Sequence, residues 1–227
     1  MDLHVFRFNP VPSTDFFQRL LSNDEVLRAD RYKSEVSYRQ YVQSRAVLRS
    51  VLSKLVSLPA REVPLQISST GKPYLAESRI EFSLSHSEDI GVLAIAVDTP
   101  VVVDLEKIRD LPEALSISEQ HFAPGEMESD EAFFRCWTRK EAYLKGLGEG
   151  LARPLDTFRI DRGEQSDEIF VPVIDSQLRH AAWFVRSFTP CKGYAGAIAA
   201  NGNDFELRQF LCVPVESLLC QEVTVCA

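Results

Sequence analysis

The chain has 227 residues, of which 45% are hydrophobic and 26% charged, a balance typical of folded globular proteins and unlike disordered or fibrous ones. Its 33 acidic and 25 basic residues give a formal net charge of −8, so long-range attraction to a nucleic-acid backbone is not expected. A protein dedicated to binding nucleic acid is therefore disfavoured.

Nothing in the sequence predicts export or membrane insertion. The chain begins Met1-Asp2 without a basic segment, and its longest apolar runs, such as residues 92–97, are far shorter than the ~18 residues that span a membrane. The five cysteines are scattered without a C-x-x-C pair, which argues against a disulfide framework or a zinc site. We therefore expect a cytoplasmic protein with reduced thiols.

The first half of the chain reads as a strand, a helix and three further strands. Alternating apolar residues predict a strand at residues 3–8, and apolar residues at helical spacing predict a long helix over residues 34–57. Strands follow at residues 80–85, 92–97 and 101–106. Because only short turns separate these three, we expect hairpin-like neighbours in a mostly antiparallel sheet.

The second half is predicted to contain one long helix followed by strands. An acidic run at residues 126–131 precedes a helical pattern over residues 132–147, where negative charge would complement the helix dipole. Glycines at positions 146, 148 and 150 allow a left-handed exit from this helix. Strands are then predicted at residues 158–160, 182–188 and 194–200.

Asp104 and Glu106 lie at the end of the strand predicted at residues 101–106. Because strand side chains alternate between faces, the two carboxylates point the same way while Val103 and Leu105 point into the core. Neighbouring carboxylates repel unless a cation or a proton neutralises one of them, and Mg²⁺ prefers such hard oxygen ligands. The alternative interpretation of so short a motif is a solvated strand end.

A second candidate pattern lies on the predicted helix. Trp137, Glu141 and Lys145 are four residues apart and therefore share one helical face. Taken alone, the Glu141 and Lys145 spacing is typical of an ordinary ion pair, worth about 0.3–0.5 kcal/mol.

A strand that leads into a polar loop and a separate turn complete the set of candidate residues. The segment Ser-Leu-Ser-His-Ser at residues 83–87 lacks the G-x-S-x-G context of a serine hydrolase, so His86 is better explained as a hydrogen-bond partner of a phosphate or a backbone group. Gly71-Lys72 lies in a turn but does not satisfy the P-loop pattern.

In their residues and in their order along the chain, these motifs closely resemble those of the Sfp-type 4'-phosphopantetheinyl transferases. The segments that carry the resemblance are Gly-Lys-Pro at 71–73, Phe-Ser-Leu-Ser-His-Ser at 82–87, Val-Asp-Leu-Glu at 103–106, Trp-Thr-Arg-Lys-Glu-Ala-Tyr-Leu-Lys at 137–145 and Gly-Glu-Gly-Leu at 148–151. The resemblance implies a pseudo-dimeric α+β fold whose two similar halves, residues 1–100 and 101–227, each pack a small, mainly antiparallel sheet on a long helix. Coenzyme A would lie in the cleft between the halves, and one chain would complete that cleft as a monomer.

The resemblance also implies the roles of individual residues. The metal ligands, which would hold Mg²⁺ on the pyrophosphate, are Asp104, Glu106 and Glu141. The coenzyme A contacts would be Lys72, Ser85 and His86 at the phosphates, with Arg45 near the 3'-phosphate and Arg39, Arg28 or Arg31 as further candidates there.

Catalysis, on the same resemblance, transfers phosphopantetheine to a serine of an apo acyl or peptidyl carrier protein and releases 3',5'-ADP. Glu141, directly or through a water, would be the general base, and Lys145 would protonate or stabilise the leaving group. Val102 departs from the family, which usually has glycine two residues before the first metal aspartate. This difference leaves open a silent relative that binds coenzyme A or a carrier without transfer, and the three carboxylates alone would also suit a Mg²⁺-dependent phosphohydrolase or nuclease.

Overall fold

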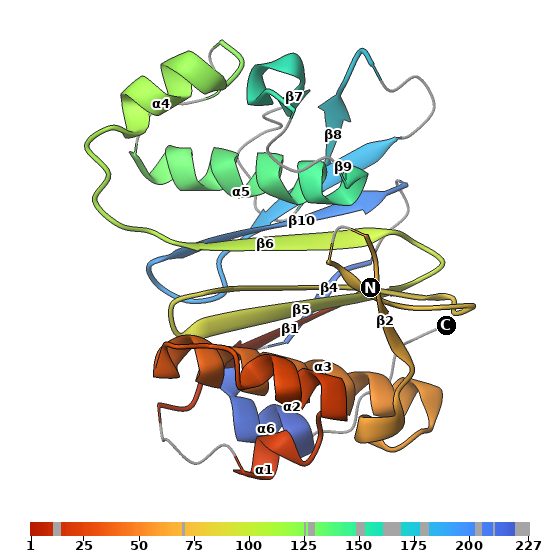
Figure 1. The fold of residues 1–227 in the computed structure, drawn as a ribbon. Helices are drawn as coiled ribbons and strands as arrows, with labels where there is room; N and C mark the ends of the chain where they lie inside the picture. The colour runs from red at the N-terminus through yellow and green to blue at the C-terminus, as the bar shows by residue number, and fades with distance from the viewer. Residues whose placement is uncertain are drawn as a thin grey trace.

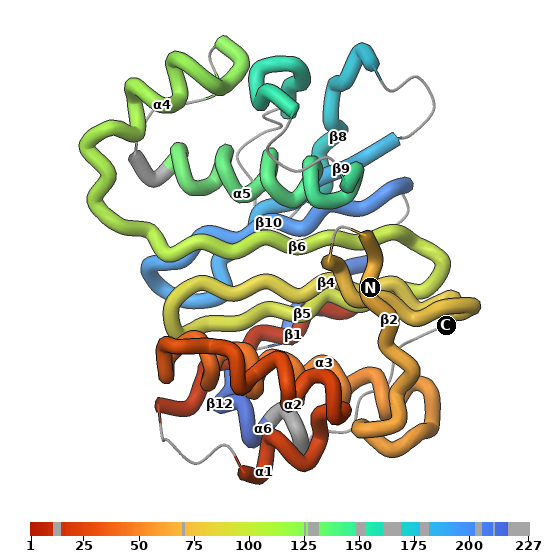
Figure 2. Tube along the Cα trace, viewed as in Figure 1, coloured from red at the N-terminus to blue at the C-terminus, as the bar shows by residue number. Residues whose placement is uncertain are grey.

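The computed structural model describes residues 1–10, 15–69, 71–124, 126, 130–148, 153–160, 169–177, 182–202, 206–210 and 212–220. In chain order the helices and strands are β1 (Asp2–Arg7), α1 (Asp15–Gln18), α2 (Asn23–Ala29), α3 (Glu35–Val56), β2 (Leu65–Ile67), β3 (Pro73–Leu75), β4 (Ile80–Ser87), β5 (Ile90–Val97), β6 (Val101–Lys107), α4 (Ala114–His121), α5 (Asp130–Leu147), β7 (Arg159–Ile160), β8 (Val171–Ile174), β9 (Trp183–Phe188), β10 (Tyr194–Asn201), β11 (Arg208–Gln209), β12 (Val213–Pro214) and α6 (Val215–Cys220). The layers run from α3 through a first and a second sheet to α5 (Figures 1 and 2).

The first half of the molecule packs α3 against a sheet of order β11-β1-β5-β4, with β12 also paired to β1. Within it, β1 and β4 are both antiparallel to β5. The helix begins after Ser34, whose hydroxyl accepts a hydrogen bond from the N–H of Ser37, and ends at Ser57 in a left-handed conformation. Its buried face, including Val47, Leu48 and Leu52, packs with Phe82 and Ile95 of the sheet.

The second half repeats this plan with α5 on an antiparallel sheet of order β6-β10-β9-β8-β7. Gly146 lets the helix approach the sheet closely, because a Cβ at that position would lie 2.5 Å from the Trp183 ring. A third apolar cluster, which includes Val92, Val103 and Ile198, joins the two sheets to each other. The predicted α+β fold of two similar halves is therefore confirmed.

Three details differ from the expectations. The prediction that β5 and β6 form a hairpin is wrong, because β6 pairs with β10 of the second sheet. The last described segment was expected in the second half, but it packs with the first: β11 and β12 pair in parallel with β1, and α6 follows them. The acidic run also does not simply begin a helix: α5 starts at Asp130, and Glu126 instead pairs with buried Lys140. Residues 127–129 lie outside the described part.

The predicted exit from α5 is confirmed at Gly148, which has φ = +74°. The rest of that glycine motif, residues 149–151, lies outside the described residues. Within the described part of the chain, no helix combines the length and apolar composition needed to cross a bilayer.

Candidate active site

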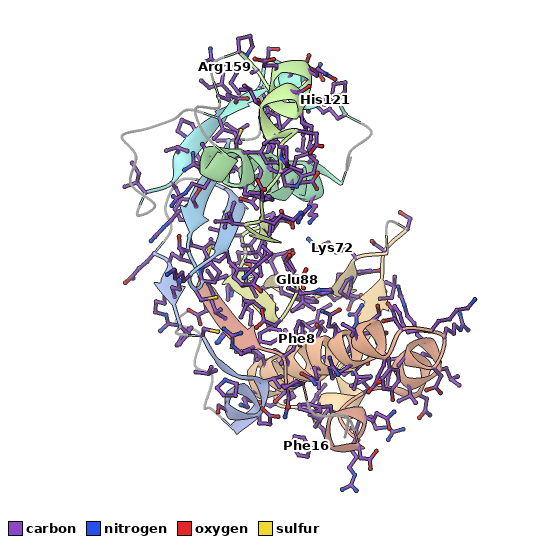
Figure 3. All side chains as sticks on the ribbon, turned by 90° about the vertical axis from the view of Figure 1, so that its left-hand side faces the viewer. Phe8, Phe16, Lys72, Glu88, His121 and Arg159 are labelled. Atoms are coloured by element: carbon purple, nitrogen blue, oxygen red, sulfur yellow. The ribbon has the colours of Figure 1, made fainter. Side chains whose placement is uncertain are left out.

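A cavity of about 630 Å³ lies where α3, the β2–β3 hairpin, β4, β6 and the end of α5 meet. Lys72, on the turn of that hairpin, lies at the level where the two halves meet (Figure 3). The lining includes four basic residues, Arg28, Arg45, Lys72 and Lys145, and none of the described lining residues is acidic. A cationic cavity in a chain of net charge −8 favours an anionic ligand.

One polar face of α3 forms a wall of the cavity. Its members recur three and four residues apart, as one helical face requires: Ser37, Gln40, Tyr41, Ser44 and Arg45. Arg39 is not among the lining residues, and its guanidinium donates to the carbonyl of Pro10 at 3.3 Å. Helix geometry thus brings Arg45 to the cavity and directs Arg39 elsewhere.

Arg45 lies between an acidic and an aromatic neighbour. Its Nε lies 4.0 Å from Glu25 Oε1, and Glu25 in turn pairs with buried Arg49. The ring of Tyr41 lies 5.5 Å from the guanidinium of Arg45 and 5.7 Å from that of Arg28. From the described residues, no hydrogen bond of normal geometry reaches the buried Arg45 Nη1 or the buried Tyr41 and Ser44 hydroxyls, although Arg45 lies close enough to Tyr41 to oppose the rise that burial causes in the pKa of the Tyr41 hydroxyl. Buried donors of this kind are costly unless a ligand satisfies them.

Lys72 and His86 approach the same space from the turn before β3 and from β4. The backbone N–H of Lys72 donates to Ser68 Oγ at 3.1 Å, and Gly71 has φ = +83°. These two features hold the backbone of the turn from which the Lys72 side chain extends. Burial lowers the pKa of Lys72, while Glu81 opposes that shift. Burial and the charge of Lys145 lower the pKa of His86, which favours its neutral form with one N–H to donate.

The carboxylates adjoin the cavity on the α5 side of β6. Val103 and Leu105 enter the core between the sheets, as the strand alternation predicts. Asp104 and Glu106 are instead opposite Ala197 and Ala195, and both of these alanines pack in the cluster under α5. The Nζ of Lys145, from α5, lies 2.5 Å from Asp104 Oδ1. Lys145 therefore links the cavity to the carboxylates.

Glu141, one turn before Lys145 on α5, completes an acidic group with Asp104 and Glu106. Burial raises the pKa of Glu141; the charges of Asp104 and Glu106 add to the shift, and Lys145 opposes it. Burial and the charge of Asp104 likewise raise the pKa of Glu106. The three carboxylates are thus close enough to influence one another.

The acidic group suits a divalent cation in its chemistry. Asp104 Oδ2 and Glu141 Oε1 are buried without hydrogen-bond partners, and Mg²⁺ takes such carboxylate oxygens as ligands. Among the described residues, no three His, Cys, Asp or Glu side chains lie close enough together to form a complete metal site. Without a cation, Lys145 is the charge that balances Asp104.

Sequence reasoning placed some side chains differently. Ser85 is not among the cavity-lining residues; its hydroxyl lies 3.4 Å from Asp104 Oδ1. Tyr41 and Ser44 of α3 both line the cavity, although no sequence motif points to either of them. Their spacing from Arg45 and Ser37 along one helical face is the signal that could have found them.

Fold and site together define an α+β protein of two halves whose cavity suits a phosphorylated ligand and whose carboxylates suit a divalent cation. Residues 9–98 match the N-terminal domain of 4'-phosphopantetheinyl transferases, and residues 100–199 match the 4'-phosphopantetheinyl transferase superfamily. The chain belongs to this family and transfers phosphopantetheine to carrier proteins.

Several curated relatives are similar in sequence to most of the chain. The 4'-phosphopantetheinyl transferase HetI of Nostoc sp. is 29% identical over 218 residues, which is 88% of each chain. The 4'-phosphopantetheinyl transferase Sfp of Bacillus subtilis is 25% identical over 89% of this chain and 92% of its own. The mouse L-aminoadipate-semialdehyde dehydrogenase-phosphopantetheinyl transferase is 26% identical over 63% of this chain and 53% of its own.

Proposed function

We propose that the chain uses Mg²⁺, held by Asp104, Glu106 and Glu141, to transfer the 4'-phosphopantetheine group of coenzyme A to a serine of an apo acyl or peptidyl carrier protein. The released product is 3',5'-ADP. The observation that carries the proposal is the position of Lys145, which lines the cationic cavity and also donates to Asp104. One continuous site can therefore bind the phosphates and act on them.

In this mechanism the residues of the chain position the substrates and move one proton. Bound Mg²⁺ would supply positive charge to the pyrophosphate oxygens. Glu141, directly or through a water, accepts the proton of the carrier serine, whose hydroxyl is too weak an acid to ionise unaided. The serine oxygen bonds to the phosphorus on the pantetheine side while that phosphorus releases the ADP oxygen. Lys145 stabilises or protonates the departing oxygen.

The remaining cavity residues bind coenzyme A. Lys72 and neutral His86 donate to its phosphates, and Ser85 supports the site through Asp104. Arg45, with Arg28 beside it, takes the 3'-phosphate, and Arg31 is a further candidate, whereas Arg39 donates to the Pro10 carbonyl outside the cavity. Since one chain supplies both halves of the cavity, we propose a monomer, located in the cytoplasm and without a nucleic-acid partner.

Transfer itself is tested by incubating the protein with an apo carrier, coenzyme A and Mg²⁺ and weighing the carrier by mass spectrometry. We expect the mass gain of one phosphopantetheine group, and no gain when a chelator replaces Mg²⁺. No gain with fatty-acid, polyketide or peptide-synthetase carriers would favour a silent relative that binds coenzyme A. Release of inorganic phosphate would instead reveal a phosphohydrolase.

Arg45→Gln is expected to raise the KM for coenzyme A about 10–100-fold, because one hydrogen bond to a charged group contributes about 1.5–3 kcal/mol. Steady-state kinetics with dephospho-coenzyme A, which lacks the 3'-phosphate, should show almost no difference from the wild type. Arg39→Gln is the comparison on the same helix. An equal rise in KM with both substrates would contradict the assignment of Arg45 to the 3'-phosphate.

A further inference from the structure

Three serines at alternate positions of β4, residues 83, 85 and 87, lie along the seam between the two sheets. β4 ends the first sheet and β6 begins the second, and Figure 1 shows the two strands as neighbours. In the described part of the chain, β4 has a backbone ladder with β5 and β6 has one with β10, but neither forms a ladder with the other. The seam must therefore be closed by other groups.

Serine hydroxyls take the place of backbone acceptors along this seam. The N–H of Val103 donates to Ser83 Oγ at 3.1 Å, and the N–H of Lys107 donates to Ser87 Oγ at 3.0 Å. Both pairs are twenty residues apart, so β4 and β6 run in the same direction. Because a side chain is inserted where a carbonyl would otherwise accept, the strands are joined without merging into one sheet.

The two anchored N–H groups bracket the carboxylates. Val103 directly precedes Asp104, and Lys107 directly follows Glu106. Each serine hydroxyl also has one proton to donate. Ser87 Oγ lies 3.4 Å from Glu106 Oε2, and Ser85 Oγ lies 3.4 Å from Asp104 Oδ1. Ser87 alone thus contacts both the backbone beside a carboxylate and the carboxylate itself.

We propose that Ser87 is a positioning residue that orients Glu106 and fixes the end of β6 for cation binding, with Ser83 fixing the strand on the other side of Asp104. This inference rests on the proposed Mg²⁺ site. Hydrogen bonds to ligating carboxylates typically change metal affinity or activity 10–100-fold when they are removed.

The test measures Mn²⁺ binding by calorimetry on the full chain saturated with coenzyme A. We expect Ser87→Ala to weaken Mn²⁺ binding about 10–100-fold and Ser87→Thr, which keeps a hydroxyl, to bind nearly as the wild type does. Coenzyme A binding in the presence of a chelator should not change. If Ser87→Ala does not fold, Ser87→Cys provides a weaker donor and acceptor of similar size and should show an intermediate loss.

Ser78→Ala is the matched control, because Ser78 Oγ accepts the N–H of Ile80 at 3.0 Å at the opposite end of β4. Both alanine variants lose an acceptor for one backbone N–H, so both should lower the Tm of the metal-free protein, but only Ser87→Ala should lose Mn²⁺ affinity. Wild-type Mn²⁺ affinity in Ser87→Ala would overturn the proposal. If the wild type binds no Mn²⁺ although it modifies a carrier, the metal site itself is wrong, and that failure is distinguishable from one confined to Ser87.

Discussion

Glu141→Gln is expected to reduce kcat/KM for carrier modification about 10²–10⁴-fold while leaving the fold intact. The amide keeps the size of the side chain but cannot accept the serine proton, and it gives a cation a much weaker ligand. Asp104→Ala should abolish transfer as well, because it removes the carboxylate that Lys145 contacts. The rates are measured by the appearance of holo-carrier. Glu119→Gln, on the exposed surface of α4, is the matched control.

The stability of Glu141→Gln separates a site residue from a structural one. A carboxyl whose pKa is raised on folding opposes folding once it is ionised. This penalty is absent below the unfolded-state pKa of about 4.3 and complete above the raised pKa of the folded state. Without metal, the variant should therefore have a Tm equal to or above that of the wild type at pH 8, and the difference should disappear as the pH falls below about 4. A lower Tm at pH 8 together with full activity would contradict the proposed role.

Periodicity predicted the main elements of the fold but not how they are connected. The strands β1, β4, β5, β6, β9 and β10 and the helices α3 and α5 each overlap a segment expected from the sequence. An alternating pattern tells which face of a strand is buried and does not tell which strand pairs with it, so the move of β6 to the second sheet was not foreseen. β11 and β12 have two residues each and carry too little pattern to predict.

The same distinction applies to the site. Alternation along β6 predicted that Asp104 and Glu106 share a face, and the packing of Val103 and Leu105 between the sheets agrees with it. The partner of Lys145 could not be predicted, because the i,i+4 spacing pointed to Glu141 whereas packing of α5 on the sheet brings Lys145 to Asp104. The contacts of the β4 serines with β6 could not be predicted either, because the motif at residues 83–87 was interpreted only through His86.

Lys140→Met is expected to destabilise the protein by about 3–5 kcal/mol, as removal of one partner of a buried ion pair typically does. Lys140 is fully buried, and its Nζ lies 2.8 Å from Glu126 Oε2, 2.8 Å from the Leu155 carbonyl and 3.1 Å from the Phe158 carbonyl. All three ammonium protons are therefore used. Methionine would leave the Glu126 carboxylate without its counter-ion, although the N–H groups of Ala123 and Ile160 still donate to it, and would remove the Lys140 donor from two carbonyls. In a chain of this length the Tm should fall by roughly 10 °C, as calorimetry can measure.

The double variant Lys140→Met with Glu126→Gln should recover part of this loss, because replacing both partners removes the unpaired charge. A single variant within about 1 kcal/mol of the wild type would contradict the structural role of Lys140. Lys140 and Glu141 are adjacent in the sequence, but one helical step of 100° turns them to different surroundings. Lys140 joins α5 to Glu126 and the loop before β7, whereas Glu141 faces the carboxylates of β6. Opposite outcomes are therefore expected from neighbouring residues: Lys140→Met should lower the Tm, and Glu141→Gln should remove activity without lowering it.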